Sequence, residues 1–124
     1  MNLPPQLWLC TRPTDMRKSY DGLAAWVRSQ LQRDPLCGQG FVFINRRHTQ
    51  LKCLYFETGG YCLWGKRLER GRYGVAQPGS TAVTALSPAE FQALIEGLDW
   101  VIKKHLKRWS KATIYNAEPD IINA

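Results

Sequence analysis

Apolar and polar residues follow a pattern that predicts a β-hairpin near the middle of the chain. Residues 51–71 read LKCLYFETGGYCLWGKRLERG, with an apolar stretch on either side of Gly59 and Gly60. Because glycine enters a tight turn without strain, we expect a two-residue turn at these positions. Tyr55 would then lie opposite Trp64 and Lys52 opposite Arg67, whereas a three-residue turn would change every pair. Both hairpin faces carry apolar side chains, which predicts that helices or another molecule cover them.

Helical patterns lie on both sides of this hairpin. Residues 20–32 have apolar side chains at helical spacing. Ser87, Pro88 and Glu90 are typical of a helix start, with a capping serine, a first-turn proline and a glutamate that completes a capping box. Residues 100–109 again have helical spacing, with basic residues on one side. The pattern therefore predicts one N-terminal helix and one or two C-terminal helices.

The remaining apolar stretches predict the other strands. Residues 6–10 and 41–44 have strand length, and residues 72–75 are a candidate for a further short strand. The expected fold is α+β, with a small, mostly antiparallel sheet of about four strands around the Gly-Gly hairpin. We expect a single domain over residues 1–109 and a polar, frayed tail over residues 110–124.

The charge balance narrows the class of partner. The chain has 124 residues, with 17 Lys and Arg against 10 Asp and Glu, and a net charge of +7. Such a balance favours polyanions or acidic protein surfaces. No apolar run is long enough to cross a membrane, and the N-terminus lacks the features of a secretory signal, so we expect a cytoplasmic protein. The four cysteines would be reduced there, and without C-x-x-C spacing they predict neither a metal site nor another cofactor.

No pattern of residues predicts catalysis. The acidic residues form no strand-end motif that would gather around a metal ion. His48 and His105 have no recognisable nucleophile beside them, and no phosphate-binding glycine loop is present in the sequence. We therefore expect a binding protein and not an enzyme.

Positive charge and aromatic rings fall together in one short region. Its candidate nucleic-acid-binding residues are Arg46, Arg47, Lys52, Lys66, Arg67, Arg70 and Arg72, with tyrosines, a phenylalanine and a tryptophan between them. Basic groups neutralise phosphates and rings stack on exposed bases, so this pattern favours nucleic-acid binding. A solvated strand edge protected by charge would give the same pattern. A different hypothesis is a protein adaptor that binds its partner through an apolar hairpin face, with Tyr55 and Trp64 as contact residues.

Two strings carry a resemblance to a known family. Residues 14–24 read TDMRKSYDGLA and residues 66–73 read KRLERGRY. Together they resemble the small Orf2-like accessory proteins, also called TnpB, of the insertion-sequence-sixty-six family of bacterial transposable elements. The resemblance covers roughly residues 7–100. It indicates the following residues as motif positions of the family, with no assigned function: Asp15, Met16, Arg17, Lys66, Arg67, Glu69 and Arg70. We expect Asp15 and Glu69 to pair with arginines or backbone N–H groups.

This resemblance implies a helper protein encoded beside a large DDE transposase, which performs the catalysis. The expected function is therefore that of a non-catalytic accessory protein of DNA transposition that binds nucleic acid through the basic-aromatic hairpin. In the alternative, the protein docks onto the transposase through the apolar hairpin face and does not contact DNA.

Overall fold

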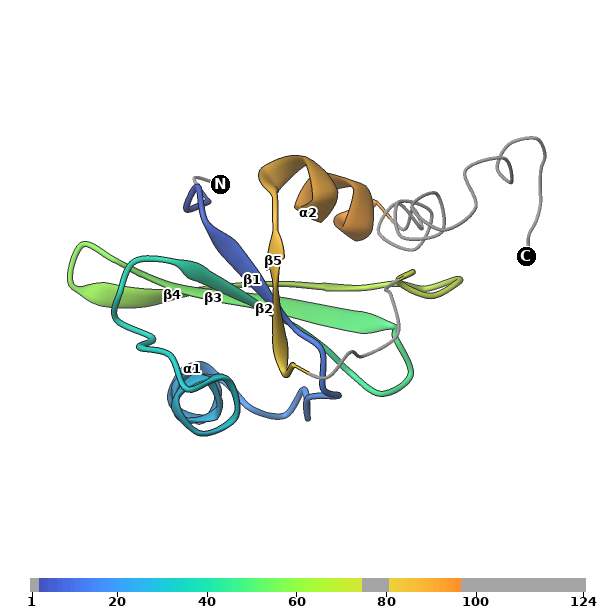
Figure 1. Ribbon diagram of the computed structural model, residues 1–124. Coiled ribbons are helices and arrows are strands. Elements are labelled where there is room, and N and C mark those ends of the chain that lie inside the picture. The colour runs from blue at the N-terminus through green and yellow to red at the C-terminus, as the bar shows by residue number, and fades with distance from the viewer. Residues whose placement is uncertain (1–2, 75–80, 97–124) are drawn as a thin grey trace.

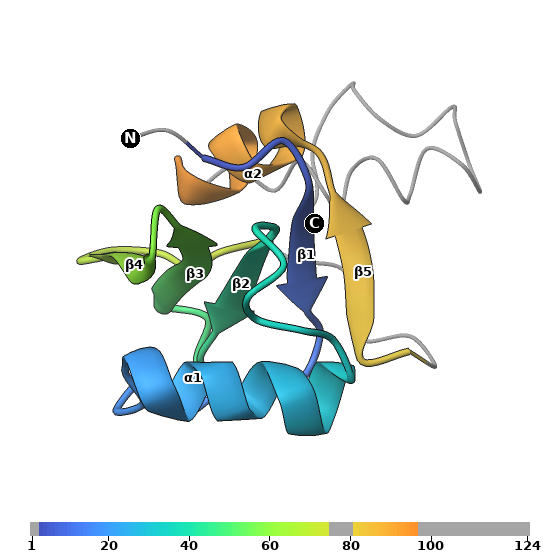
Figure 2. The same ribbon diagram turned by 90° about the vertical axis from the view of Figure 1, so that its left-hand side faces the viewer.

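Five strands form one sheet in the computed structural model, which describes residues 3–74 and 81–96. The spatial order is β4-β3-β2-β1-β5, and the strands are β1 (Leu7–Cys10), β2 (Gly40–Ile44), β3 (Gln50–Glu57), β4 (Gly60–Arg67) and β5 (Val83–Leu86) (Figure 1). Helix α1 (Tyr20–Trp26), continued by the π-helical turn η1 (Val27–Leu31), lies on one face of the sheet, and α2 (Pro88–Ile95) lies on the other (Figure 2). None of the helices in this described part is long and apolar enough to span a membrane.

The predicted α+β class is confirmed, but the sheet has one more strand than expected. The missed strand is β5, whose two central residues, Thr84 and Ala85, are exposed and give no apolar alternation. It pairs antiparallel with β1, and β1 in turn pairs parallel with β2 through the α1 connection. The candidate strand at 72–75 is absent from residues 72–74, the part of that stretch that the structure describes.

The hairpin is present, but its turn lies one residue earlier than predicted. Glu57 pairs with Gly60, so the turn residues are Thr58 and Gly59, with φ angles of 50° and 80°. Two positive φ angles are what a type I′ turn requires. The sequence Thr-Gly-Gly can place a two-residue turn at either pair, and the register of the flanking strands selects the earlier one.

This register changes the predicted cross-strand pairs. Lys52 lies opposite Gly65 and not opposite Arg67, so the expected pair of like charges does not form. Tyr55 lies opposite Cys62, and Trp64 lies opposite Cys53. Because partners move by two positions, each side chain still points to the face that alternation predicts.

Both faces of the sheet bury an apolar layer. On the α2 side, Leu51 and Tyr55 of the hairpin join Phe91 and Leu94 of the helix. On the α1 side, Leu54 of β3 joins Leu23, Val27 and other helix residues. Helices thus account for a hairpin that is apolar on both sides.

Two of the predicted helices lie in the described part of the chain. The capping box at Ser87 and Glu90 is present, with both reciprocal hydrogen bonds. The helical stretch at 20–32 extends to Leu31 and ends where Gln32 takes a left-handed conformation. The helix at 100–109 and the tail at 110–124 lie outside the described residues, so the domain boundary stays a prediction.

Candidate nucleic-acid interface

Two arginine-bearing segments meet at one end of the sheet. The β2–β3 turn, residues 45–49, carries two arginines, and the segment that follows β4 carries two more. The Leu68 N–H donates to the Thr49 carbonyl at 2.8 Å, and the Tyr73 N–H donates to the His48 carbonyl at 2.7 Å. Arg67, the last residue of β4, pairs with Gln50. We call this surface the basic end, and its residues are Arg46, Arg47, Arg67, Arg70 and Arg72.

The β2–β3 turn is held firmly by one asparagine. The Asn45 side-chain oxygen accepts from the backbone N–H groups of Thr49 and Gln50, at 2.8 and 3.0 Å. Its carbonyl accepts from the N–H of His48 at 3.0 Å, and His48 takes a positive φ of 58°. These hydrogen bonds fix the backbone that carries the two arginines, which lowers the backbone entropy lost on binding.

The segment after β4 is anchored through its apolar side chains. Tyr73 is 1% exposed, and its hydroxyl donates to the Lys66 carbonyl at 3.1 Å. Burial raises the pKa of this phenol. Leu68 packs against the same core cluster. Arg70 and Arg72, which lie between these anchors, are exposed.

Within the described residues, one ion pair involves an arginine of the basic end. Glu69 forms an exposed ion pair with Arg67, with 3.2 Å between the carboxylate oxygen and Nε. Within residues 3–74 and 81–96, the other four arginines, Arg46, Arg47, Arg70 and Arg72, form no ion pair, and all four are exposed. An anion would therefore meet four cationic side chains without displacing a carboxylate of the described residues.

The two lysines predicted to bind nucleic acid, Lys52 and Lys66, donate hydrogen bonds to backbone carbonyls outside the basic end. The Lys52 ammonium donates to the Met16 and Lys18 carbonyls, each at 2.8 Å. The aliphatic part of the Lys52 side chain lies beside Gly65 on the neighbouring strand, and a β-carbon added to this glycine would be 3.6 Å from Lys52 Cγ. The Lys66 ammonium donates to the Ile95 carbonyl at 2.6 Å, at the C-terminal end of α2. These lysines join the hairpin to the elements on its two faces, and sequence spacing alone did not reveal that role.

The aromatic rings also lie elsewhere than expected. Tyr55 is 7% exposed, and Trp64 packs edge-on against Phe91 with 6.0 Å between ring centroids. Phe56 and Tyr61 pair edge-on beside the hairpin turn, at the opposite end of β3 and β4 from the basic end. The expected surface of interleaved rings and cations is therefore not formed by these side chains, because strand alternation sends the rings into the two cores.

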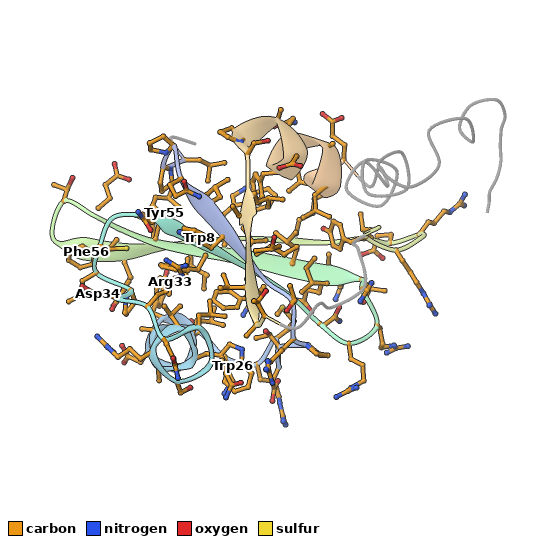
Figure 3. All side chains as sticks on the ribbon, viewed as in Figure 1. Trp8, Trp26, Arg33, Asp34, Tyr55 and Phe56 are labelled. Carbon is orange, nitrogen blue, oxygen red and sulfur yellow. The ribbon has the colours of Figure 1, made fainter. Side chains whose placement is uncertain are left out.

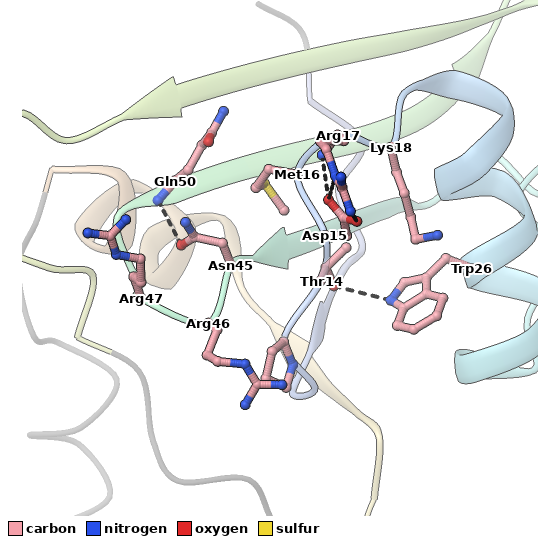
Figure 4. A pocket seen from close by; sticks show the side chains of 11 residues that line it. Thr14, Asp15, Met16, Arg17, Lys18, Trp26, Asn45, Arg46, Arg47 and Gln50 are labelled. Carbon is pink, nitrogen blue, oxygen red and sulfur yellow. Dashed lines mark hydrogen bonds and ion pairs between the residues drawn. The ribbon is translucent and has the colours of Figure 1, made fainter.

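An open pocket of about 620 Å³ adjoins the basic end. It lies between the β2–β3 turn, which supplies Arg46 and Arg47, and the β1–α1 loop, which supplies residues 13–18 (Figure 4). Trp26 of α1 (Figure 3) completes the wall, and its ring N–H donates to Thr14 Oγ1 at 3.1 Å (Figure 4). Residues 14–18 of this loop belong to the first string that carries the family resemblance. Their position beside the β2–β3 turn follows from the folded structure and could not be predicted from the string.

One carboxylate, Asp15, lines the pocket, and it is already paired. It accepts from the Arg17 guanidinium at 2.8 Å and from the Arg17 backbone N–H at 2.9 Å. These hydrogen bonds hold the pKa of Asp15 well below its usual range. Asp15 therefore stays ionised, with its charge balanced by Arg17, as expected from the sequence. Among the described residues, no three His, Cys, Asp or Glu side chains are placed to hold a metal ion.

Fold and site together define a small α+β protein with a cationic surface and an adjoining open pocket. The chain belongs to the family described as IS66 Orf2-like protein, whose model matches residues 5–105. This confirms the family predicted from the two strings. Its members are accessory proteins associated with transposition, and the family is not a known catalytic one.

Two similar proteins come from Sinorhizobium fredii (strain NBRC 101917 / NGR234). The uncharacterized protein y4jC is 39% identical over 108 residues, which cover 86% of this chain and 92% of that protein. The uncharacterized protein y4hO is 39% identical over 95 residues, which cover 77% and 82%. No solved structure matches the chain at a significant level.

Proposed function

We propose that this accessory protein binds DNA through the basic end and contributes no catalytic group to transposition. The observation that carries the proposal is the joining of two arginine-bearing segments by backbone hydrogen bonds at one end of the sheet. Four of these arginines have no ion-pair partner within the described residues. Arginine binds phosphate oxygens with paired N–H groups, so the surface suits a phosphate backbone.

The proposed interface differs from the one predicted from sequence. Phosphate contact is assigned to Arg46, Arg47, Arg70 and Arg72, with Arg67 in support. Lys52 and Lys66 are assigned to the framework, because their ammonium groups bond backbone carbonyls. The adaptor alternative has less support, since helices α1 and α2 cover the hairpin faces on which it depends.

Salt dependence of binding tests the proposal. Four phosphate contacts on duplex DNA correspond to a slope of about −3.6 in log affinity against log salt, which is −0.9 multiplied by four. Between 50 and 200 mM salt, the affinity would then fall by about 150-fold. Fluorescence anisotropy with a labelled 20-base-pair duplex at several salt concentrations measures this slope.

Matched variants separate specific contacts from general charge. Arg46→Ala with Arg47→Ala should reduce the slope to about −1.8, because two contacts are lost. Arg28→Ala is the control, since Arg28 is exposed on η1 and does not line the pocket. Absence of binding at low salt, or an equal effect per charge removed in the control, would refute the proposed interface.

A further inference from the structure

We propose that the pocket beside the basic end holds one nucleotide of single-stranded DNA. The protein would then prefer a single strand, or a duplex with a single-stranded extension, to a blunt duplex. This inference rests on the proposed function and adds the form of DNA that is bound.

The pocket's position in the sheet is the first argument. Strands β1 and β2 are parallel neighbours. The loop that lines one side of the pocket follows β1, and the turn that lines the other side follows β2. The Thr14 N–H donates to the Ile44 carbonyl at 3.0 Å and holds the two segments together. In open α/β sheets, ligands bind outside the carboxyl ends of the parallel strands, and this pocket lies at the corresponding end of β1 and β2.

The pocket's size is the second argument. A volume of about 620 Å³ falls in the range of small-molecule sites and accommodates one nucleotide. The bases of a duplex are stacked and paired inside the double helix, so a base must leave the stack before it enters such a pocket. A single strand or a frayed end avoids the cost of unstacking, and the pocket would favour these forms.

The chemistry of the walls is the third argument. Figure 4 shows Arg46 and Arg47 on the turn side and Trp26 on the helix side of the pocket. The Trp26 ring is fixed by its bond to Thr14, and the Lys18 ammonium lies 4.9 Å from the ring centroid. Met16 adds apolar surface to the same wall. The turn side therefore offers cations for the phosphate. The loop and helix side offers Trp26 and Met16 for the base, beside the charged side chains of Asp15, Arg17 and Lys18.

The pocket is also continuous with the proposed DNA-binding surface. Arg46 and Arg47 belong both to the basic end and to the pocket lining. A strand whose phosphates contact Arg70 and Arg72 and then this turn would bring its next nucleotide to the pocket. The carboxylate in the lining does not oppose this path, because Arg17 balances the charge of Asp15.

The experiment compares three fluorescein-labelled probes with the full chain at one salt concentration. They are a 20-nucleotide single strand, the blunt duplex of the same sequence, and that duplex with a five-nucleotide single-stranded extension. One base stacked on an aromatic ring strengthens binding by about tenfold or more, so the single strand and the extended duplex should bind about tenfold more tightly than the blunt duplex. Equal affinity for all three probes would overturn the inference but leave the proposed function intact.

Pocket variants provide the decisive control, because single strands also bind some proteins through flexibility alone. Gln50→Trp should obstruct part of the pocket and reduce the preference, while its affinity for blunt duplex stays within about twofold of that of the parent. Gln92→Trp, on the exposed side of α2, is the matched control and should keep the preference. Trp26→Phe should keep the preference, and Trp26→Leu should lose it, with urea unfolding confirming that each variant is folded.

Two outcomes contradict different claims. An undiminished single-strand preference in folded Gln50→Trp would overturn the nucleotide pocket. Failure of every probe to bind at low salt would overturn both the pocket and the proposed function.

Discussion

Substitution of Lys52 tests whether this residue stabilises the fold or binds phosphate. The sequence pattern groups it with the phosphate-binding residues, whereas its ammonium donates to the Met16 and Lys18 carbonyls, each at 2.8 Å. Lys52→Met keeps most of the stem and removes the donor. We expect this variant to lose stability and to bind DNA as the parent does.

The expected loss in unfolding free energy can be estimated from the two hydrogen bonds of the Lys52 ammonium. Hydrogen bonds from a charged donor contribute about 1.5–3 kcal/mol each, which would total about 3–6 kcal/mol for a buried pair. Lys52 is half-buried, so water reaches part of the site and the expected loss in unfolding free energy is about 2–3 kcal/mol. For a chain of this length, that loss lowers the melting temperature by roughly 10 °C.

Urea unfolding followed by circular dichroism measures the stability, and anisotropy across salt measures the DNA contact. Lys66→Met is the comparison, since its exposed ammonium makes one bond to Ile95 and its loss should cost about 1 kcal/mol. Two results together would refute the framework role of Lys52. The unfolding free energy of Lys52→Met would lie within about 0.5 kcal/mol of that of the parent, and the slope of log affinity against log salt would become shallower by about 0.9.

Three further predictions concern the sheet and its cysteines. Thr58→Asn should raise the unfolding free energy by about 0.5–1 kcal/mol, because Thr58 has a φ of 50° that asparagine tolerates better; an unchanged urea midpoint would contradict this. Gly40→Ala should lower the unfolding free energy by about 1–3 kcal/mol, since the new Cβ would lie 2.5 Å from Cδ2 of the fully buried Leu7; calorimetry would show the lower melting temperature. Exposed Cys37 should react first with a thiol reagent, whereas burial raises the pKa of Cys53 to about 12, so Cys53 should react only after unfolding.

The pKa of Cys53 also carries a sign for stability. The folded pKa lies above that of the unfolded thiol, so its contribution is complete below about pH 9 and decreases as the pH rises toward 12. Melting temperatures should therefore fall above about pH 9. In Cys53→Ala that part of the decline should be absent, and an identical decline in this variant would contradict the assignment.

Local signals in the sequence predicted much of the fold. The capping box at Ser87 and Glu90, the apolar spacing of the first helix and the alternation in the hairpin each depend on residues close together in the chain. Strand β5 escaped prediction because its central residues are exposed. The parallel pairing of β1 with β2 also escaped, since it joins segments separated by about thirty residues and has no local signature.

The candidate site was predictable only in part. The sequence placed Arg46 and Arg47 in one region with Arg67, Arg70 and Arg72, but it did not show which backbone groups join the two segments. The hydrogen bonds from Leu68 and Tyr73 to the β2–β3 turn bring them together. The spacing grouped Lys52 with the phosphate-binding candidates and did not reveal its hydrogen bonds to the Met16 and Lys18 carbonyls, because a lysine that binds carbonyls and one that binds phosphate look alike in a sequence.

Composition and neighbours along the chain were enough to predict the family, the α+β class, the helix capped by Ser87 and the excess of positive charge. Long-range packing fixed which cations face solvent and which rings enter the cores, and it brought the β1–α1 loop and the β2–β3 turn together around a pocket. Those outcomes depend on strand register and on sheet order, which arise from contacts between residues far apart in the chain.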